Sequence, residues 1–495
     1  MCISASGRKR LQTGGKLLRN SIKRMICCAV IGSLSMSQLV AQGKHQENSV
    51  KPPAPYLPVP NPAQLRWHKA EYEMFIHFGM KTFYPSDNHM GNGGEDPKRF
   101  NPVLFNADQW VKAAKAGGFS GIVITAKHHD GFCNWQTQTT THSVGSSGWR
   151  NGKGDVMKDL SEACRRSGMG FGIYVSIIDK HYERAGSKED RSYGDYYYRQ
   201  INELSSNYGK VDHYWFDGFN ADSLKLDYPA VARLIAKKQP EAVVYDSHVM
   251  VSTIPDRCIA WPGGHGGVKP DQDYVQVIDG QRRWYPSEPS LILQGNWFHI
   301  GKPCVSLAQT KEYYLSTVGY GLTPLMNVAP NMKGLIDDSA IMMLSSFKKW
   351  VDSLHQCNAA RHARAKDDGH RGNSPKFDAS KVNDGNYDTY FATNDGVTDA
   401  TIELDLGATR KIDGFILQEY IPLGQRVDGY TIECRVNGKW TEVFSGKKIG
   451  YQRIIFAGMA SAKQVGFPDA DAVRLKIRDA RACPLINNFQ VISLK

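Results

Sequence analysis

The chain has 495 residues, 41% hydrophobic and 22% charged, which is long enough for two or three globular domains with sizeable cores. Its formal charge of +12 would suit a nucleic-acid-binding protein, but seven of the positive charges precede residue 42 with no acid among them, leaving +5 for the rest. No Lys/Arg-rich block interleaved with aromatic residues follows, so nucleic-acid binding is set aside.

Residues 1–41 have the layout of a secretory signal peptide. A basic stretch precedes the apolar segment "MICCAVIGSLSMSQLVA", which ends in small residues. This segment is too short and too Ser-rich for a membrane span. We expect cleavage near Ala41 and export to the periplasm or the exterior of a bacterial cell; the alternative is a disordered basic leader.

The ten cysteines predict neither a disulfide framework nor a metal site. Three of them lie in the leader, and the remaining seven are scattered singly with no C-x-x-C pair. Isolated cysteines of this kind are typical of small apolar residues in a core.

Residues 42–63 are Pro-rich ("KPPAPYLPVPNPAQ" covers 51–64) and predict an extended linker or a strap against a domain. Strand-like and helix-like runs then alternate from residue 64 to residue 356. The strand-like runs are continuously apolar, as in parallel sheets covered on both faces. No G-x-G-x-x-G follows the first strand, so we expect a (β/α)8-like TIM barrel over 64–356 rather than an open dinucleotide-binding sheet.

Past Cys357 the sequence changes to short β-rich runs separated by Gly and Asn/Asp turns. Examples are "TIELDLG", "GYTIECRV" and "AVRLKIRD". Residues 357–495 therefore predict a separate all-β sandwich domain.

Polar side chains stand where the predicted barrel strands end. One such residue is more often a helix cap or a turn residue than a catalyst. Five strand ends together favour a functional site, because the carboxyl ends of barrel strands converge. Aromatic residues near them would suit a sugar-sized site. The strand-end residues are His77, His128, His129, Asp130, Ser176, Asp179, Asp217, Asp246 and His248, and the aromatic residues are Trp135, Tyr174, Trp215 and Trp297.

Other chemistries have weaker support. His128 and His129 are adjacent, so in an extended strand they point to opposite sides and cannot both bind one ion unless the backbone turns. Neither an H-E-x-x-H nor a G-x-S-x-G motif occurs. A pair of carboxyl groups, one ionised and one held protonated, is the simplest catalytic machinery that the sequence offers.

Asp217 suits the ionised role, because aromatic neighbours in "HYWFDGFN" exclude water and histidines can stabilise its charge. Glu288 is the candidate for the protonated role. It lies between Pro286 and Pro289, in an apolar setting of the kind that raises a carboxyl pKa. The alternative is that Glu288 is an exposed loop acid.

Six motifs in order resemble the α-L-fucosidases of glycoside hydrolase family 29: "FIHFGM", "GGEDPKRFNP", "ITAKHHDGF", "FGIYVS", "YWFDG" and "PLMNVAP". The resemblance covers about residues 64–356 and implies retaining exo-hydrolysis of α-L-fucosides without a catalytic cofactor. It implies Asp217 as the nucleophile. It also implies His77, His128 and His129 as the fucose-binding positions, with Trp135 and Tyr174 as wall residues. The strand-end pattern adds Trp215 and Trp297 to the candidate substrate-binding residues.

The stretch "YPSEPSLILQGNWF" resembles the acid/base segment of the family branch that prefers α-1,3/1,4-linked fucose, which implies Glu288 as the acid/base. The chain departs from that branch at Gln294 and Asn296, where an Arg-containing segment is usual, and at Ile177, where a Trp is frequent. These departures bear on substrate preference more than on catalysis.

The C-terminal part resembles the discoidin (F5/8 type C) sandwich through "VNDGNYDTYFAT" and "LQEYIPLGQRVDGYTIE". Asp384 and Asp388 in this part either hold a structural Ca²⁺ or form an Asx turn, and the sequence favours neither. We therefore expect an exported α-L-fucosidase that acts on fucosylated oligosaccharides or glycans. The alternatives are a non-catalytic carbohydrate-binding protein or the same machinery acting on an α-L-galactoside.

Overall fold

The structure is a computed structural model that describes residues 50–184, 192–218, 226–246, 248–260, 262, 271, 273–456 and 466–494. The predicted signal peptide lies outside the described residues. Residues 52–495 form one compact unit. No helix in the described ranges is both long enough and apolar enough to cross a membrane.

The first part of this unit is the predicted barrel. Eight strands pair in parallel in the order β6-β5-β4-β3-β2-β1-β10-β9. A further parallel bridge joins Ala260 to Ser287, just before β9, and so links the two ends of the sheet. The strands are β1 (Glu73–Ile76), β2 (Gly121–Lys127), β3 (Gly170–Ser176), β4 (His213–Asp217), β5 (Val243–Asp246), β6 (Cys258–Ala260), β9 (Ser290–Ile292) and β10 (Leu325–Asn327).

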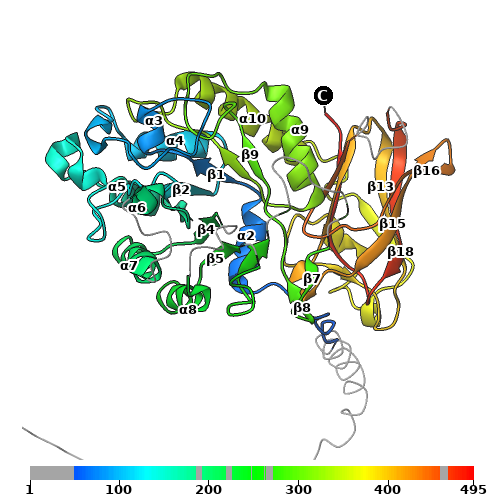
Figure 1. The fold of residues 1–495 in the computed structure, drawn as a ribbon. Helices are drawn as coiled ribbons and strands as arrows, with labels where there is room; N and C mark the ends of the chain where they lie inside the picture. The colour runs from blue at the N-terminus through cyan, green and yellow to red at the C-terminus, as the bar shows by residue number, and fades with distance from the viewer. Residues whose placement is uncertain are drawn as a thin grey trace, which may run out of the picture. The chain divides into compact units, whose positions relative to one another are not determined.

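Helices cover the outside of the strands (Figure 1). Several begin where the sequence supplies a capping side chain: Asn106, Asp155, Asp227 and Ser306 each accept a hydrogen bond from a backbone N–H of the first turn. The helices are α2 (Pro62–Ala70), α3 (Met80–Phe83), α4 (Ala107–Ala116), α5 (Val156–Ser167), α6 (Lys180–Arg184), α7 (Ser192–Asn207), α8 (Tyr228–Lys238), α9 (Leu307–Thr317) and α10 (Asp338–Gln356).

The alternation of strand and helix breaks down between β5 and β9. In the described part of this stretch, β6 follows β5 without a helix, and a hairpin of β7 (Val275–Ile278) and β8 (Gln281–Trp284) precedes β9. The barrel is therefore (β/α)8-like rather than a regular repeat.

Three aromatic rings stack inside the barrel because their residues are register partners on neighbouring strands. Trp215 of β4 pairs with Tyr174 of β3 and with Tyr245 of β5. Its indole is nearly parallel to both rings, at centroid distances of 5.4 Å and 4.0 Å. We call these three residues the aromatic stack; it packs with Phe75 and other inward-facing residues in one buried cluster.

The C-terminal part is a two-sheet sandwich, as expected. One sheet has the order β11-β13-β18-β15-β16 and the other β12-β19-β14-β17. The strands are β11 (Arg364–Asp367), β12 (Phe391–Ala392), β13 (Ala400–Arg410), β14 (Gly414–Glu419), β15 (Val427–Val436), β16 (Lys439–Gly446), β17 (Arg453–Phe456), β18 (Ala470–Ala480) and β19 (Leu485–Ile492).

The Pro-rich segment lies against this sandwich as a strap. The backbone N–H of Tyr56 donates to the carbonyl of Leu423 at 2.9 Å. The buried guanidinium of Arg426 donates to the carbonyl of Ala54 at 2.7 Å. The seven cysteines after the leader are all free thiols.

A buried ion pair supports the loops at the carboxyl end of the barrel. Lys127 Nζ lies 3.1 Å from Asp179 Oδ2, and both side chains are fully buried. Burial would raise the pKa of Asp179, but Lys127 and the hydrogen bonds to this carboxylate outweigh it and lower the pKa. The pair therefore holds Asp179 ionised in the core.

We predict that Lys127→Met lowers the free energy of unfolding by about 3 kcal/mol or more, because it leaves a buried carboxylate without its partner. Lys348→Met is the control, since it removes a half-exposed pair with Asp352 on α10 and should cost about 0.5 kcal/mol. Chemical denaturation of both variants measures the difference. Equal losses would contradict a structural role for the buried pair.

Candidate active site

Asp217 ends β4, and three neighbouring groups contact its carboxylate. Its Oδ2 accepts a hydrogen bond from the Tyr174 hydroxyl at 2.6 Å and lies 3.4 Å from His129 Nε2. Its Oδ1 accepts from the backbone N–H of Gly218 at 2.8 Å. Burial would raise the pKa of Asp217, but His129, Tyr174 and Gly218 together lower it. The side chain remains 37% exposed, so Asp217 is an ionised carboxylate that a ligand can reach.

His128 and His129 both face this site because β2 ends at Lys127 and the backbone then turns. The N–H of Gly131 donates to the carbonyl of His128, and the two imidazole rings lie 4.3 Å apart. The backbone therefore turns after β2, and the two adjacent imidazoles lie on the same side of the chain rather than on opposite faces of a strand. The Ser176 hydroxyl donates to the Ile178 carbonyl, so His129 Nδ1, 2.6 Å from the Ser176 oxygen, carries the hydrogen of that contact.

His77 and two aromatic residues form the opposite wall. His77 Nδ1 lies 2.8 Å from Asn327 Oδ1, at the end of β10. Burial lowers the pKa of His77 to about 3, against the opposing effects of Asn327 and Asp217, so the ring is neutral. Trp297 lies 4.8 Å from His77, and Phe298 packs edge-on against both His77 and His128. The wall is therefore apolar with neutral imidazole edges.

His128 Nδ1 has no hydrogen-bond partner among the described residues, although it is buried. Burial lowers the pKa of His128 well below its usual value, and the neighbouring histidines add to the effect. The ring is therefore neutral.

The structure corrects the expected role of Glu288. This residue precedes β9, whereas Asp217 ends β4, so the two lie toward opposite ends of parallel strands. Glu288 is 1% exposed, and its two oxygens accept hydrogen bonds from the indole N–H groups of Trp67 and Trp215 at 2.8 Å and 2.9 Å. A fully buried carboxyl beneath Trp215 is not placed to protonate a leaving group at Asp217.

One part of the expectation for Glu288 agrees with the structure, namely an apolar setting. Burial raises the pKa of Glu288 to about 7, although His213 and the two indole groups oppose the rise.

Of the four aromatic residues expected to form the walls of the site, some lie at it and one does not. Tyr174 and Trp297 lie at the site, as the contacts above show. Trp215 is 6% exposed and forms its floor within the aromatic stack. Trp135 is a further correction: it is fully buried in the outer core, and its indole N–H donates to Glu203 of α7 at 2.8 Å.

Other polar strand ends have structural roles. Asp246 accepts hydrogen bonds from the backbone N–H groups of Met250 and Val251 and from the Tyr285 hydroxyl, so it organises the turn after β5. Asp130 likewise accepts from the N–H of Phe132. His248 is exposed and packs edge-on against Tyr285.

The structure favours an Asx turn at the proposed Ca²⁺ position. The two oxygens of Asp384 accept from the Asn386 N–H at 2.8 Å and from the Thr389 hydroxyl at 2.7 Å. Asp388 instead faces Lys69 Nζ at 4.0 Å.

Two residues of the site were not selected from the sequence. Asn327 ends the last barrel strand in "PLMNVAP", so the strand-end pattern applied to that strand would have found it. His89 lies 6.0 Å from His128 but belongs to a loop, where no spacing signals a role.

Comparison with known proteins identifies the family of the chain. The family model described as α-L-fucosidase matches residues 41–355, and the F5/8 type C domain model matches residues 363–486. The chain belongs to the α-L-fucosidase family. It is 32% identical over 480 residues to α-L-fucosidase 1 of Arabidopsis thaliana, covering 92% of this chain and 90% of that protein.

Solved structures of the family share the fold. A putative α-L-fucosidase from Bacteroides thetaiotaomicron has a TM-score of 0.82 at 29% identity, over 90% of this chain and 99% of its own. A Ruminococcus gnavus fucosidase of glycoside hydrolase family 29, solved in complex with fucose, has a TM-score of 0.79 at 26% identity, over 90% and 97%.

We predict that Tyr174→Phe shifts the acid limb of the pH–activity profile to higher pH. Loss of the Tyr174 hydrogen bond removes one of the contacts that lower the pKa of Asp217, so the carboxylate protonates at higher pH. The measurement is kcat/KM for an aryl α-L-fucoside across pH. Tyr245→Phe is the control, because Tyr245 stacks on the other face of Trp215 and its hydroxyl makes no hydrogen bond to Asp217. The same acid limb in wild type and Tyr174→Phe would contradict the prediction.

Proposed function

We propose that the protein is a retaining exo-α-L-fucosidase in which Asp217 is the nucleophile. The observation that carries this proposal is an ionised, accessible carboxylate at the end of β4, held by Tyr174 and His129. In retaining hydrolysis such a carboxylate attacks the anomeric carbon and forms a glycosyl-enzyme, which water then cleaves.

The two oxygens of Asp217 have different contacts: Oδ2 faces Tyr174 and His129, and Oδ1 accepts from the backbone N–H of Gly218. Oδ2 accepts from Tyr174 and faces His129, which fixes the plane of the carboxylate. As an oxygen of Asp217 bonds to the anomeric carbon, the bond from that carbon to the leaving oxygen breaks, and the leaving oxygen takes up a proton. Because Glu288 is buried away from Asp217, a water molecule at the exposed side of Asp217 supplies this proton. The hydroxide that remains is consumed when the glycosyl-enzyme is hydrolysed.

The apolar wall supports L-fucose as the sugar. Fucose carries a methyl group where galactose carries a hydroxymethyl group, and Trp297 and Phe298 offer apolar surface beside His77. The neutral imidazoles of His77 and His128 can exchange hydrogen bonds with ring hydroxyls. An α-L-galactoside would leave its 6-hydroxyl against this apolar surface, which costs affinity.

The substrates we propose are fucosylated oligosaccharides or glycans with α-1,3/1,4-linked terminal fucose. The support for this linkage is the resemblance of segment 285–298, whose Trp297 and Phe298 lie at the site. Release of fucose from a panel of α-1,2-, α-1,3-, α-1,4- and α-1,6-fucosylated oligosaccharides tests it. Preferential cleavage of the α-1,2 or α-1,6 members would contradict the linkage.

We also propose export, supported by the basic, apolar and small-residue order of residues 1–41. Mass spectrometry of the mature N-terminus should find a chain that begins near Gln42. An intact Met1 on the exported protein would contradict cleavage.

We predict that Asp217→Ala lowers kcat on an aryl α-L-fucoside by about 10³-fold or more, because the covalent step is lost. Asp212→Asn is the matched control: Asp212 precedes the same strand at the other end of the barrel, where it accepts from the Phe171 N–H. In the wild type, the first fucose released should be the α anomer by NMR.

Equal rates for wild type and Asp217→Ala would end the nucleophile assignment. A binding-only protein is the competing function, and one observation favours it: the described side chains that contact Asp217 include no second carboxyl group. Fucose binding without hydrolysis by the wild type would establish that function.

A further inference from the structure

A buried polar triad lies beneath the aromatic stack. His213 Nδ1 is 2.9 Å from Glu73 Oε2, and His213 Nε2 is 3.6 Å from Glu288 Oε1. All three residues are buried. Burial would lower the pKa of His213, but Glu288 and Glu73 outweigh it and raise the pKa. A carboxyl group therefore faces each ring nitrogen: Nδ1 is hydrogen-bonded to Glu73, and Nε2 lies at ion-pair distance from Glu288 without a hydrogen bond.

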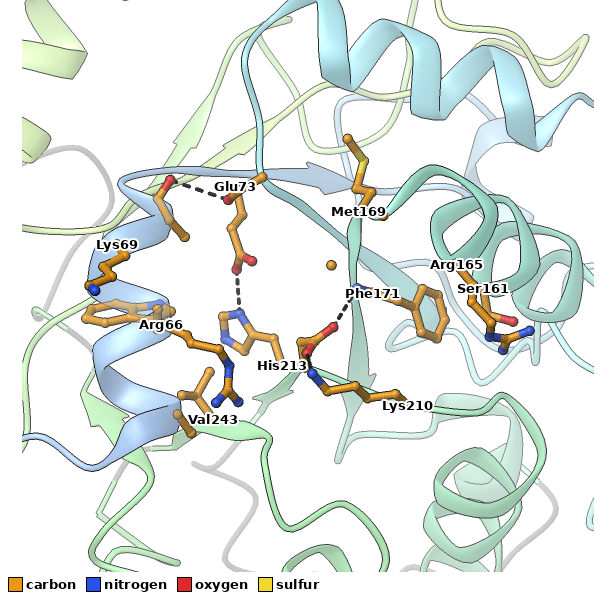
Figure 2. A pocket seen from close by; sticks show the side chains of 17 residues that line it. Arg66, Lys69, Glu73, Ser161, Arg165, Met169, Phe171, Lys210, His213 and Val243 are labelled. Carbon is orange, nitrogen blue, oxygen red and sulfur yellow. Dashed lines mark hydrogen bonds and ion pairs between the residues drawn. The ribbon is translucent and has the colours of Figure 1, made fainter.

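Two members of the triad line a cavity at the amino end of the barrel, away from Asp217. Glu73 and His213 line a cavity of about 550 Å³ together with residues that begin the strands, such as Phe171 and Val243. Figure 2 shows Glu73 and His213 joined by a hydrogen bond at this cavity, with Arg66 and Lys210 nearby. Protons can therefore reach the triad without passing through the active site.

Glu288 connects the triad to the aromatic stack. It accepts the indole N–H of Trp215, and the Trp215 ring is held between Tyr174 and Tyr245. Tyr174 in turn donates its hydroxyl to Asp217 at 2.6 Å. Trp215 and Asp217 are also two residues apart on the same inward face of β4. A displacement of the Trp215 ring is thus transmitted to Asp217 through both the stacked tyrosine and the strand.

We propose that Glu288, braced by His213 and Glu73, is a positioning residue that fixes Trp215 and thereby the geometry of Asp217. This inference rests on the proposed role of Asp217 as nucleophile. It assigns Glu288 a role in the reaction that involves neither contact with the sugar nor proton transfer to it.

A metal site is the other chemistry that these residues could support. Among the described residues, these three form the group whose donor atoms lie within 4.8 Å of one another, as metal ligands would. Hydrogen bonding accounts for them better, because both oxygens of Glu288 already accept indole N–H groups and His213 Nδ1 faces Glu73. Chelator treatment should therefore leave kcat unchanged, and a chelator-induced loss that Zn²⁺ restores would overturn the proposal.

The first test is Glu288→Gln, which keeps the size of the side chain but turns one acceptor into an NH₂ donor that opposes an indole N–H. We expect kcat to fall about tenfold or more, because small misplacements of reacting groups have such effects, with KM nearly unchanged. The fall should be similar for an aryl α-L-fucoside and for α-L-fucosyl fluoride. A loss confined to the substrate with the poorer leaving group would make Glu288 the acid/base, and an unchanged kcat would remove it from the reaction.

Glu419→Gln is the matched control. Glu419 of the sandwich is equally buried, its pKa is also raised to about 7 by burial, and its oxygens accept only backbone N–H groups. This variant can lower stability but should leave kcat of the folded protein unchanged. A similar fall in kcat for both variants would show that loss of any buried carboxylate suffices.

A second variant covers the case in which Glu288→Gln does not fold. Trp215→Phe keeps an aromatic ring in the stack and removes the N–H that Glu288 accepts. It should reproduce the fall in kcat at unchanged KM, and in the double variant the two effects should not add. Additive effects, or an unchanged kcat in Trp215→Phe, would contradict the pathway through Trp215.

Tryptophan fluorescence gives a readout that does not depend on hydrolysis. Glu288 contacts two indoles, so its titration near pH 7 should change the emission of Trp67 and Trp215. The ionisable groups that face it are Glu73, His213 and Tyr245. The transition should vanish in Glu288→Gln and persist in Glu419→Gln, and its persistence in Glu288→Gln would overturn the assignment. If the wild type hydrolyses no α-L-fucoside, the proposed function fails. The fluorescence titration still tests whether Glu288 contacts Trp67 and Trp215 as proposed.

Discussion

The parallel register of β3, β4 and β5 is the constraint on which the rest of the site depends. It makes Tyr174, Trp215 and Tyr245 neighbours on adjacent strands, so their rings stack across the barrel interior. The stack separates two polar regions of different character. Above it lie Asp217 and the histidines of the site, and below it lies the triad of Glu73, His213 and Glu288. A slip of one residue in β4 would turn both Trp215 and Asp217 out of the barrel.

The electrostatics of the two regions follow from what each carboxyl group contacts. Asp217 is partly exposed and receives three stabilising contacts, so it stays ionised at the pH where a nucleophile must attack. Glu288 is sealed by Trp67 and Trp215, and desolvation outweighs the same kind of contacts. Two acids inside one barrel thus have pKa values shifted in opposite directions. One ionised and one protonated carboxyl group is the pair expected from the sequence, yet the second acid lies away from the first.

Much of the fold was predictable because it depends on local patterns. Continuous apolar strands with polar ends indicated a parallel barrel, and the change in texture after residue 357 indicated the sandwich. Asp217, His77, His128 and His129 followed from the rule that strand ends converge. Glu288 did not, because the short strand β9 begins only at Ser290, and the sequence does not reveal on which side of the strand a nearby Glu lies. The sequence wrongly placed Trp135 at the site. Cys133 forms an antiparallel bridge with Lys127, so the chain turns back beside β2. The Trp135 side chain therefore reaches Glu203 of α7 instead.

In the proposed reaction, Asp217 forms the covalent bond to the sugar. The most direct test is mass spectrometry of the protein trapped with 2-deoxy-2-fluoro-α-L-fucosyl fluoride, followed by peptide mapping. If Asp217 is the nucleophile, a single label will be found on the peptide that contains it. A label on a peptide that lacks Asp217 would contradict it.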